Sequence, residues 1–162
     1  MRRLATRLSE GVDRVTLALA ALLAAAMTLA LAVQVLFRFV LRAPLSWSEE
    51  LARYCFVWLA SLGAAAGVRR GLHPGIELWP AGVPAWVRRA VAIVGVGVVG
   101  AFLIVLAAYG WRLAAFNMRQ RSPAMGLPMG LPYAAVPTGA VVMLVHLVAR
   151  LLEGPREEPP GA

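Results

Sequence analysis

Apolar residues form four long stretches along this chain, and short segments between them hold nearly all the charged residues. Three stretches contain no Asp, Glu, Lys or Arg: residues 15–37, 90–111 and 122–149. Each exceeds the roughly 20 residues that a helix, rising 1.5 Å per residue, needs to cross about 30 Å of hydrocarbon. A fourth uncharged run, residues 54–68, is shorter. The pattern therefore predicts helices that span a membrane.

The fourth run covers only about 22 Å as a helix, so a complete span has to include flanking charged residues. A span that starts at Glu49 and ends at Val68 has 20 residues and places Glu49, Glu50 and Arg53 at the membrane boundary. Ser46 and Glu49 fit the capping box S-x-x-E. Glu49 and Arg53 stand four residues apart in the favoured order, so they can form an ion pair.

Glu50 is left without a local partner. Arg38, near the end of the first apolar stretch, is the obvious candidate for an ion pair with Glu50. The alternative is that both side chains only reach water among the lipid headgroups. The residues alone favour neither alternative.

The expected fold class is therefore an all-α integral membrane protein with four transmembrane helices. The approximate spans are residues 15–37, 49–68, 90–111 and 131–150, and residues 1–162 form a single membrane domain. The first stretch is too long for the 7 to 15 apolar residues of a cleaved secretory signal, and further spans follow it. Composition agrees, since 60% of residues are hydrophobic and 15% are charged, against about 25% charged in soluble domains.

Arginine counts at the helix ends predict the orientation, because cytoplasmic segments retain positive charge. One side would hold Arg2, Arg3, Arg7, Arg14, Arg69, Arg70, Arg88, Arg89, Arg150 and Arg156, and the other Arg38, Arg42, Arg53, Arg112, Arg119 and Arg121. Ten arginines against six place both termini in the cytoplasm. The net charge is +8, and the basic residues flank the apolar spans on both sides instead of gathering on one face. This distribution argues against binding of nucleic acid and favours anionic lipid headgroups as the counter-ions.

Two glycine patterns have a structural interpretation and a functional one. Residues 95–100 match the dinucleotide fingerprint G-x-G-x-x-G, but no Asp or Glu occurs between Glu77 and Glu153 to hold a ribose. Gly63 and Gly67 form G-x-x-x-G in the second span. Glycines in spanning helices commonly let neighbouring helices approach closely, so we expect both patterns to serve packing.

Candidate reactive residues are few. His73 and His146 could in principle ligate a haem, but His73 lies in a predicted loop beside Pro74. Cys55 is the single cysteine, and a lone thiol in a helix is usually inert. No catalytic set, phosphate loop or metal-spaced cluster is evident. We therefore expect neither enzyme activity nor a cofactor or metal.

The stretch LFRFVLRAPLSWSEELARYCFVWLASLGAAAGVRRGLH, residues 36–73, resembles the small permease subunit of TRAP transporters, the tripartite ATP-independent periplasmic transporters. The matching positions are Arg38, Trp47, Glu49, Glu50, Gly63, Arg69, Arg70 and His73. The last span, LPYAAVPTGAVVMLVHLV, is similar to the last helix of that family with its early proline, here Pro137. One departure is Pro74-Gly75, which follows His73 where the family continues with an apolar and acidic stretch.

The resemblance implies a multi-pass subunit of the bacterial inner membrane that takes part in sodium-coupled uptake of organic acids. Its partners would be a large TRAP permease subunit, which it would scaffold, and a periplasmic substrate-binding protein, which it would help to dock. Arg38, Trp47, Glu49, Glu50, Arg53, Gly63, Gly67 and His73 are the candidates for assembly. The alternatives are the small subunit of another tripartite carboxylate transporter and a haem-bearing respiratory membrane anchor. The transported substrate is not evident from the sequence.

Overall fold

The computed structural model describes residues 2–70 and 84–153, and the chain is helical through most of them. The elements are α1 (Arg2–Phe39), α2 (Ser46–Arg70), α3 (Ala85–Phe116), the 3-10 turn η1 (Asn117–Arg119), α4 (Gly130–Tyr133) and α5 (Ala135–Glu153). Four segments are long and apolar enough to cross a membrane: Arg7–Phe39, Ser46–Arg70, Ala85–Arg119 and Gly130–Leu152. The prediction of four spanning helices is thus confirmed.

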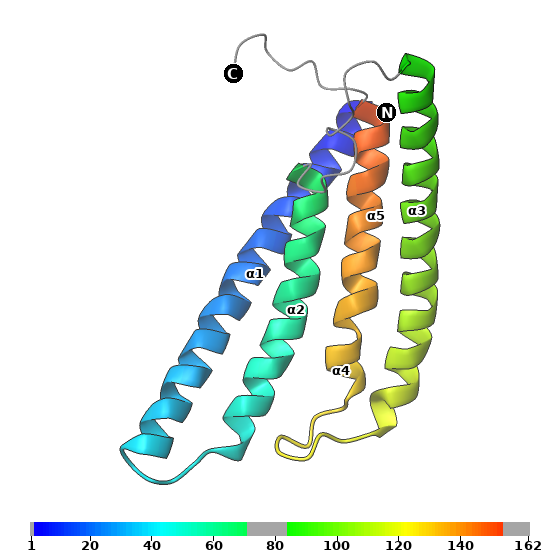
Figure 1. Cartoon of the computed structure of the whole chain (residues 1–162). Coiled ribbons are helices and arrows are strands. Elements are labelled where there is room, and N and C mark those ends of the chain that lie inside the picture. Colours follow the sequence, from blue (N-terminus) through cyan, green and yellow to red (C-terminus); the bar gives the residue numbers. More distant parts are fainter. Residues whose placement is uncertain (1, 71–83, 154–162) are drawn as a thin grey trace, which may run out of the picture.

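The long helices lie side by side in the order α1, α2, α5, α3 (Figure 1). α2 contacts both α1 and α5, and α1 also reaches α5. α3 packs on α5 and on the short elements α4 and η1, without touching α1 or α2. One face of α5 therefore carries α3 alone, and the other three long helices form the better-packed part of the bundle.

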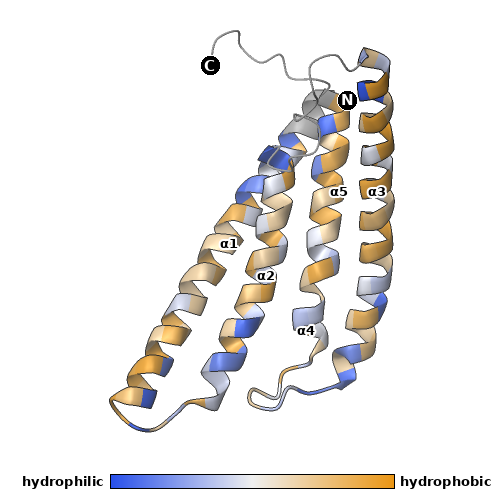
Figure 2. Cartoon of the chain, in the orientation of Figure 1, coloured by the Kyte–Doolittle hydropathy of each residue, from blue (hydrophilic) through white to orange (hydrophobic). Residues whose placement is uncertain are grey.

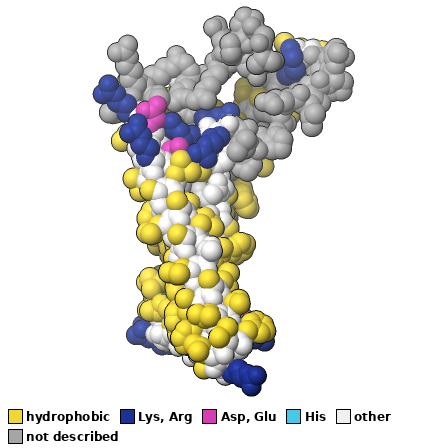
Figure 3. Space-filling view, turned by 90° about the vertical axis from the view of Figure 1, so that its left-hand side faces the viewer, with side chains coloured by type: hydrophobic (Ala, Val, Ile, Leu, Met, Phe, Trp, Pro, Cys, Tyr) yellow, Lys and Arg dark blue, Asp and Glu magenta, His cyan; other side chains and the backbone are white. Residues whose placement is uncertain are grey.

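The bundle has two polar ends. At the terminal end lie the start of α1, the end of α2, the start of α3 and the end of α5; at the hairpin end lie the connections of residues 40–45 and 117–134 (Figure 1). Residues between the ends are mostly apolar (Figure 2). Arginines gather at both ends of the face turned toward the viewer in Figure 3, with acidic side chains among them at the terminal end. α1 thus begins, and α5 ends, at the same end of the bundle, as the prediction of both termini on one side of the membrane requires.

The helices extend beyond the spans expected from the sequence. α1 has 38 residues and starts at Arg2, thirteen positions before the expected span. In this extension Ser9, Glu10 and Asp13 contact Arg69 of α2. The last span is divided into α4 and α5 at Ala134. Pro137 has no N–H to donate to the carbonyl of Tyr133, which weakens the helix at this point. The Thr138 hydroxyl donates to the carbonyl of Ala134 at 2.7 Å.

Close helix approaches occur at glycines that the sequence analysis did not select. A Cβ on Gly139 of α5 would lie 3.0 Å from both Cβ and the carbonyl oxygen of Ser61, and a Cβ on Gly110 would lie 3.0 Å from Cβ of Pro137. A Cβ on Gly63 or Gly67 would meet nothing within 4 Å. The prediction that the G-x-x-x-G motif packs helices was therefore wrong for the helices of this chain.

The G-x-G-x-x-G pattern shows the same result. It lies inside α3, where a dinucleotide fingerprint would need a strand and a turn. Added Cβ atoms on Gly95 and Gly97 would meet nothing within 4 Å, and one on Gly100 would make only an ordinary contact with Leu147 at 3.8 Å. α3 is simply too weakly packed, over most of its circumference, for these glycines to have a neighbour.

Candidate functional site

The carboxylate of Glu50 is the best-connected acidic group at the hairpin end. Glu50 is only 8% exposed, although it stands in the first turns of α2. The hydroxyl of Tyr54, one turn further on, donates to Oε1 at 2.8 Å, and the backbone N–H of Ala124 donates to Oε2 at 2.9 Å. Both carboxylate oxygens therefore have a donor, and one of these donors lies 74 positions away in the chain.

The segment that Glu50 contacts is a tight hairpin between η1 and α4, hereafter the hairpin of residues 120–129. The Ser122 N–H donates to the carbonyl of Leu127 at 2.8 Å, and the Met129 N–H donates to the carbonyl of Gln120 at 2.9 Å. Gly126 has φ +66°, a left-handed conformation that glycine adopts without steric cost. The chain can therefore reverse here within a few residues and present the amide of Ala124 to α2.

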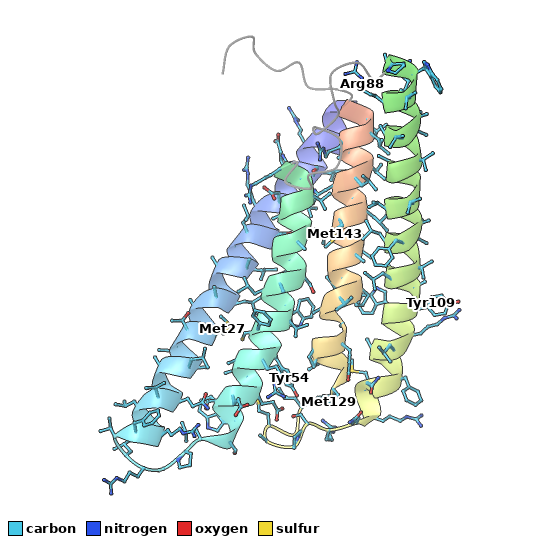
Figure 4. The ribbon with its side chains drawn as sticks, in the orientation of Figure 1. Met27, Tyr54, Arg88, Tyr109, Met129 and Met143 are labelled. Carbon is cyan, nitrogen blue, oxygen red and sulfur yellow. The ribbon has the colours of Figure 1, made fainter. Side chains whose placement is uncertain are left out.

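Tyr54 reaches the second arm of the same hairpin. Its hydroxyl lies 3.1 Å from Sδ of Met129 (Figure 4). A hydroxyl has a single hydrogen, and a carboxylate is a much stronger acceptor than a thioether, so the hydrogen points to Glu50 and the sulfur makes a contact only. Glu50 and Tyr54, one turn apart on α2, thus hold the hairpin at two places. We call this pair the Glu50 clasp.

The pairing of Arg38 with Glu50 considered in the sequence analysis is not formed. The guanidinium of Arg38 lies over the ring of Phe39, 5.8 Å from its centroid, while the oxygens of Glu50 are engaged by Tyr54 and Ala124. A backbone amide contributed by a distant turn leaves no periodic signal in the sequence. The turn residues Ser122, Pro123 and Gly126 were the only indication that a compact loop was present.

The other candidates at this end are surface residues. Glu49 and Arg53 form the expected ion pair at 3.0 Å, with both side chains about two-thirds exposed, so that prediction is confirmed. Trp47 is also exposed, as suits an aromatic residue at a membrane interface. Ser46 is the first residue of α2, and within the described residues its side chain makes no hydrogen bond that would complete the expected capping box. Ser48 is completely buried and donates to the carbonyl of Leu45 at 2.9 Å, a bond that leaves the first N–H groups of the helix uncapped.

At the terminal end, a buried histidine joins three helices. His146 of α5 is 0% exposed, and its Nδ1 lies 2.9 Å from Oγ of Ser9 on α1. Arg69 of α2 donates to the same Ser9 oxygen. The Ser9 oxygen has two lone pairs and one hydrogen, so it can accept from Arg69 and also share a hydrogen bond with Nδ1 of His146, whose direction depends on the imidazole tautomer. The ring is thus engaged in a structural contact.

Acidic residues of α1 complete this cluster, hereafter the His146 cluster. Arg69 lies 3.6 Å from Asp13 and 3.8 Å from Glu10, and Arg70 lies 3.9 Å from Asp13. Arg150 of α5 donates to the carbonyl of Val68 at 3.1 Å. α1, α2 and α5 are therefore tied together by charged and polar groups. The sequence analysis missed this, because it treated the arginines at this end as lipid-facing charges and did not consider their acidic partners.

The remaining candidates have no reactive arrangement. His73 lies outside the described residues. Cys55 is buried and free, and no group of three or more His, Cys, Asp or Glu side chains comes together in residues 2–70 and 84–153. Near the middle of the spans, the Thr28 hydroxyl is bound to its own helix, donating to the carbonyl of Ala24 at 2.8 Å. The polar groups are thus arranged to hold helices and loops in place.

These features define a class: a multi-pass membrane protein of four spanning helices, braced at its two ends and apolar between them. Comparison with known proteins gives the family. A sequence model described as "Tripartite ATP-independent periplasmic transporters, DctQ component" matches residues 27–157. Because the match covers most of the sequence, the chain belongs to this family, and the resemblance seen in residues 36–73 is confirmed.

Three curated relatives agree. A C4-dicarboxylate TRAP transporter small permease protein DctQ of Rhodobacter capsulatus is 38% identical over 101 residues, which are 61% of this chain and 44% of the relative. A putative TRAP transporter small permease protein of Haemophilus influenzae is 25% identical over 94% of this chain and 92% of its own length. A DctQ protein of Vibrio cholerae is 26% identical over 85% of this chain and 70% of its own length. The first match thus spans less than half of that relative.

Proposed function

We propose that this chain is the small membrane subunit of a sodium-coupled, binding-protein-dependent TRAP transporter for organic acids. It scaffolds the large permease subunit and helps to dock a periplasmic substrate-binding protein. Family membership supports this proposal. Two relatives are named for C4-dicarboxylates, so dicarboxylates of this size are the first substrates to test.

The observation that carries the scaffold role is the contrast between the ends and the middle of the bundle. A path for an organic anion needs polar or ionisable groups near the midplane of the membrane. In the described residues the ion pairs and the Glu50 clasp lie at the two ends of the bundle, and the Thr28 hydroxyl is bound to its own helix. A chain of this kind braces a partner, and the substrate path belongs to that partner.

Uptake in cells tests this role. Deleting the chain from the intact transporter should abolish dicarboxylate uptake, and expression from a plasmid should restore it. The purified chain should give no calorimetric response to the dicarboxylate that the soluble binding protein captures. Uptake that continues without the chain, or heat of binding from the chain alone, would contradict the scaffold role.

The ten-to-six arginine distribution supports an inner-membrane location with the terminal end in the cytoplasm. Reporter fusions after Gly161 should then be active as cytoplasmic reporters, and fusions within the hairpin of residues 120–129 as periplasmic ones. The reverse result would place the Glu50 clasp in the cytoplasm and contradict the proposed orientation.

A further inference from the structure

A groove of about 460 Å³ runs along the terminal half of the bundle and lies outside both polar clusters. Residues from successive turns of α1 line one side of the groove. Trp58 and Leu62 of α2 and Thr138 and Val142 of α5 line the rest. Its volume falls within the range of about 300–1,000 Å³ typical of sites for small molecules. Apart from one arginine and two threonines, the groove is lined by apolar residues and glycine.

The groove has a charged end and an apolar end. Arg7, Gly11, Val15 and Leu19 follow each other at intervals of four, so they lie on one face of α1. From Arg7 to Leu19 the helix rises about 18 Å, somewhat more than half of the roughly 30 Å hydrocarbon core. The groove is therefore about one leaflet deep, with its guanidinium at the level of the headgroups.

Charge selects the kind of molecule that fits. Glu10 and Asp13 point toward Arg69, on the side of the His146 cluster. Arg7 is exposed, and within the part of the chain that the structure describes it has no carboxylate within 4.0 Å. An arginine beside an apolar groove fits a phosphate with an acyl chain below it.

We propose that this groove binds one anionic phospholipid of the leaflet at the terminal end, with its phosphate at Arg7 and an acyl chain along Gly11, Val15 and Leu19. The bound lipid covers the seam between α1 and α5, which share less contact with each other than either shares with α2. A transmembrane helix of a partner subunit is the other conceivable occupant, but an apolar helix would leave the guanidinium of Arg7 without a counter-charge.

Native mass spectrometry of the purified full chain tests the proposal. The chain would be exchanged into detergent and titrated with phosphatidylglycerol or, separately, with phosphatidylcholine. We expect one phosphatidylglycerol to be retained more strongly than phosphatidylcholine, and excess inorganic phosphate not to displace it. Arg7→Gln should weaken phosphatidylglycerol binding about fivefold, the factor that corresponds to about 1 kcal/mol for one arginine at a membrane surface. Arg88→Gln, which removes a charge from α3 at the same end (Figure 4), should have no effect.

A second variant tests the role of the groove independently of the charge of Arg7. Gly11 lines the groove, and an added Cβ there meets nothing within 4 Å, so Gly11→Leu can attach its side chain without a backbone clash and occupy space in the groove. It should abolish retention of the lipid, whereas Gly97→Leu, equally open but on α3, should keep it. Equal retention by Gly11→Leu and the original chain would overturn the proposal. So would loss of the large subunit from purified Gly11→Leu complexes with lipid retention unchanged, because the groove would then belong to a helix.

Discussion

The contact between Gly139 of α5 and Ser61 of α2 provides a measurable test of how this bundle is packed. In Gly139→Ala, the new methyl carbon would lie 3.0 Å from Cβ and the carbonyl oxygen of Ser61 and 3.2 Å from its carbonyl carbon. Ordinary contacts between carbon atoms are about 3.5–4.0 Å. Two of the three atoms are backbone, so no rotamer change can relieve the overlap. The two helices would have to separate by about 0.5–1 Å.

Two opposing effects set the size of the change. Overpacking in a well-packed core costs about 1–3 kcal/mol, and replacing glycine by alanine inside a helix returns up to about 1 kcal/mol. Gly139→Ala should therefore lower the free energy of unfolding by about 0–3 kcal/mol. Gly63→Ala is the matched control, because it makes the same chemical change within α2 where an added Cβ meets nothing within 4 Å. The control should be neutral or slightly stabilised, so the two variants should differ by about 1–3 kcal/mol.

Unfolding of the purified full chain in mild detergent, driven by increasing mole fractions of sodium dodecyl sulfate and followed by circular dichroism, would measure this difference. The comparison between variants matters more than either absolute value, because both start from the same detergent-solubilised state. If Gly139→Ala is as stable as Gly63→Ala, the approach of α5 to α2 at Gly139 is not a tight contact, and the reasoning is refuted.

Two further predictions concern the polar ends. Glu50→Gln removes one of the two carboxylate acceptors, so the Ala124 amide should exchange with deuterium faster, as measured by mass spectrometry. Glu49→Gln, which alters only an exposed ion pair, should leave that exchange rate unchanged. An unaltered rate in Glu50→Gln would show that the hairpin does not depend on the clasp. Ser9→Ala removes the hydrogen-bond partner of Nδ1 of His146. It should lower the free energy of unfolding, measured by the same detergent unfolding, by about 1–3 kcal/mol, as for other buried polar groups left without a partner. Stability equal to that of the original chain would contradict the buried bond.

The spans were predictable from the sequence because the bilayer imposes one simple requirement. A stretch without charges and longer than about 20 residues has few other structures open to it. The same requirement explains why the exposed pair of Glu49 and Arg53 was found: a spacing of four along one helix is a local signal. The extension of α1 toward Arg2 was missed because the uncharged stretch begins only at Val15, whereas the contacts of Glu10 and Asp13 with Arg69 join distant parts of the chain.

Contacts between distant segments could not be predicted. Of the two donors to Glu50, Tyr54 lies one turn away, but the other is an amide 74 positions away, and the identity of that amide depends on how the hairpin folds. The glycines show the same limit, since Gly63 and Gly139 are both glycines in spanning helices, yet only Gly139 faces a neighbour. Which face of a helix is turned inward depends on the order of the helices, and neither the uncharged stretches nor the arginine count contains that order.

α2 shows how a helix of low mean hydropathy can span the membrane. Its mean hydropathy of 1.4 is the lowest of the four spans, against 2.3 for α1 and 2.8 for α3, and it lies between two neighbours, whereas α3 has one. Glu50 and Arg69 stand 19 residues apart, a rise of about 29 Å, which matches the roughly 30 Å of a hydrocarbon core. Their partners therefore satisfy them at the two boundaries, and the residues between need not be strongly apolar because protein covers much of that helix. The two polar clusters thus fix both the depth of α2 in the membrane and the helices that pack around it.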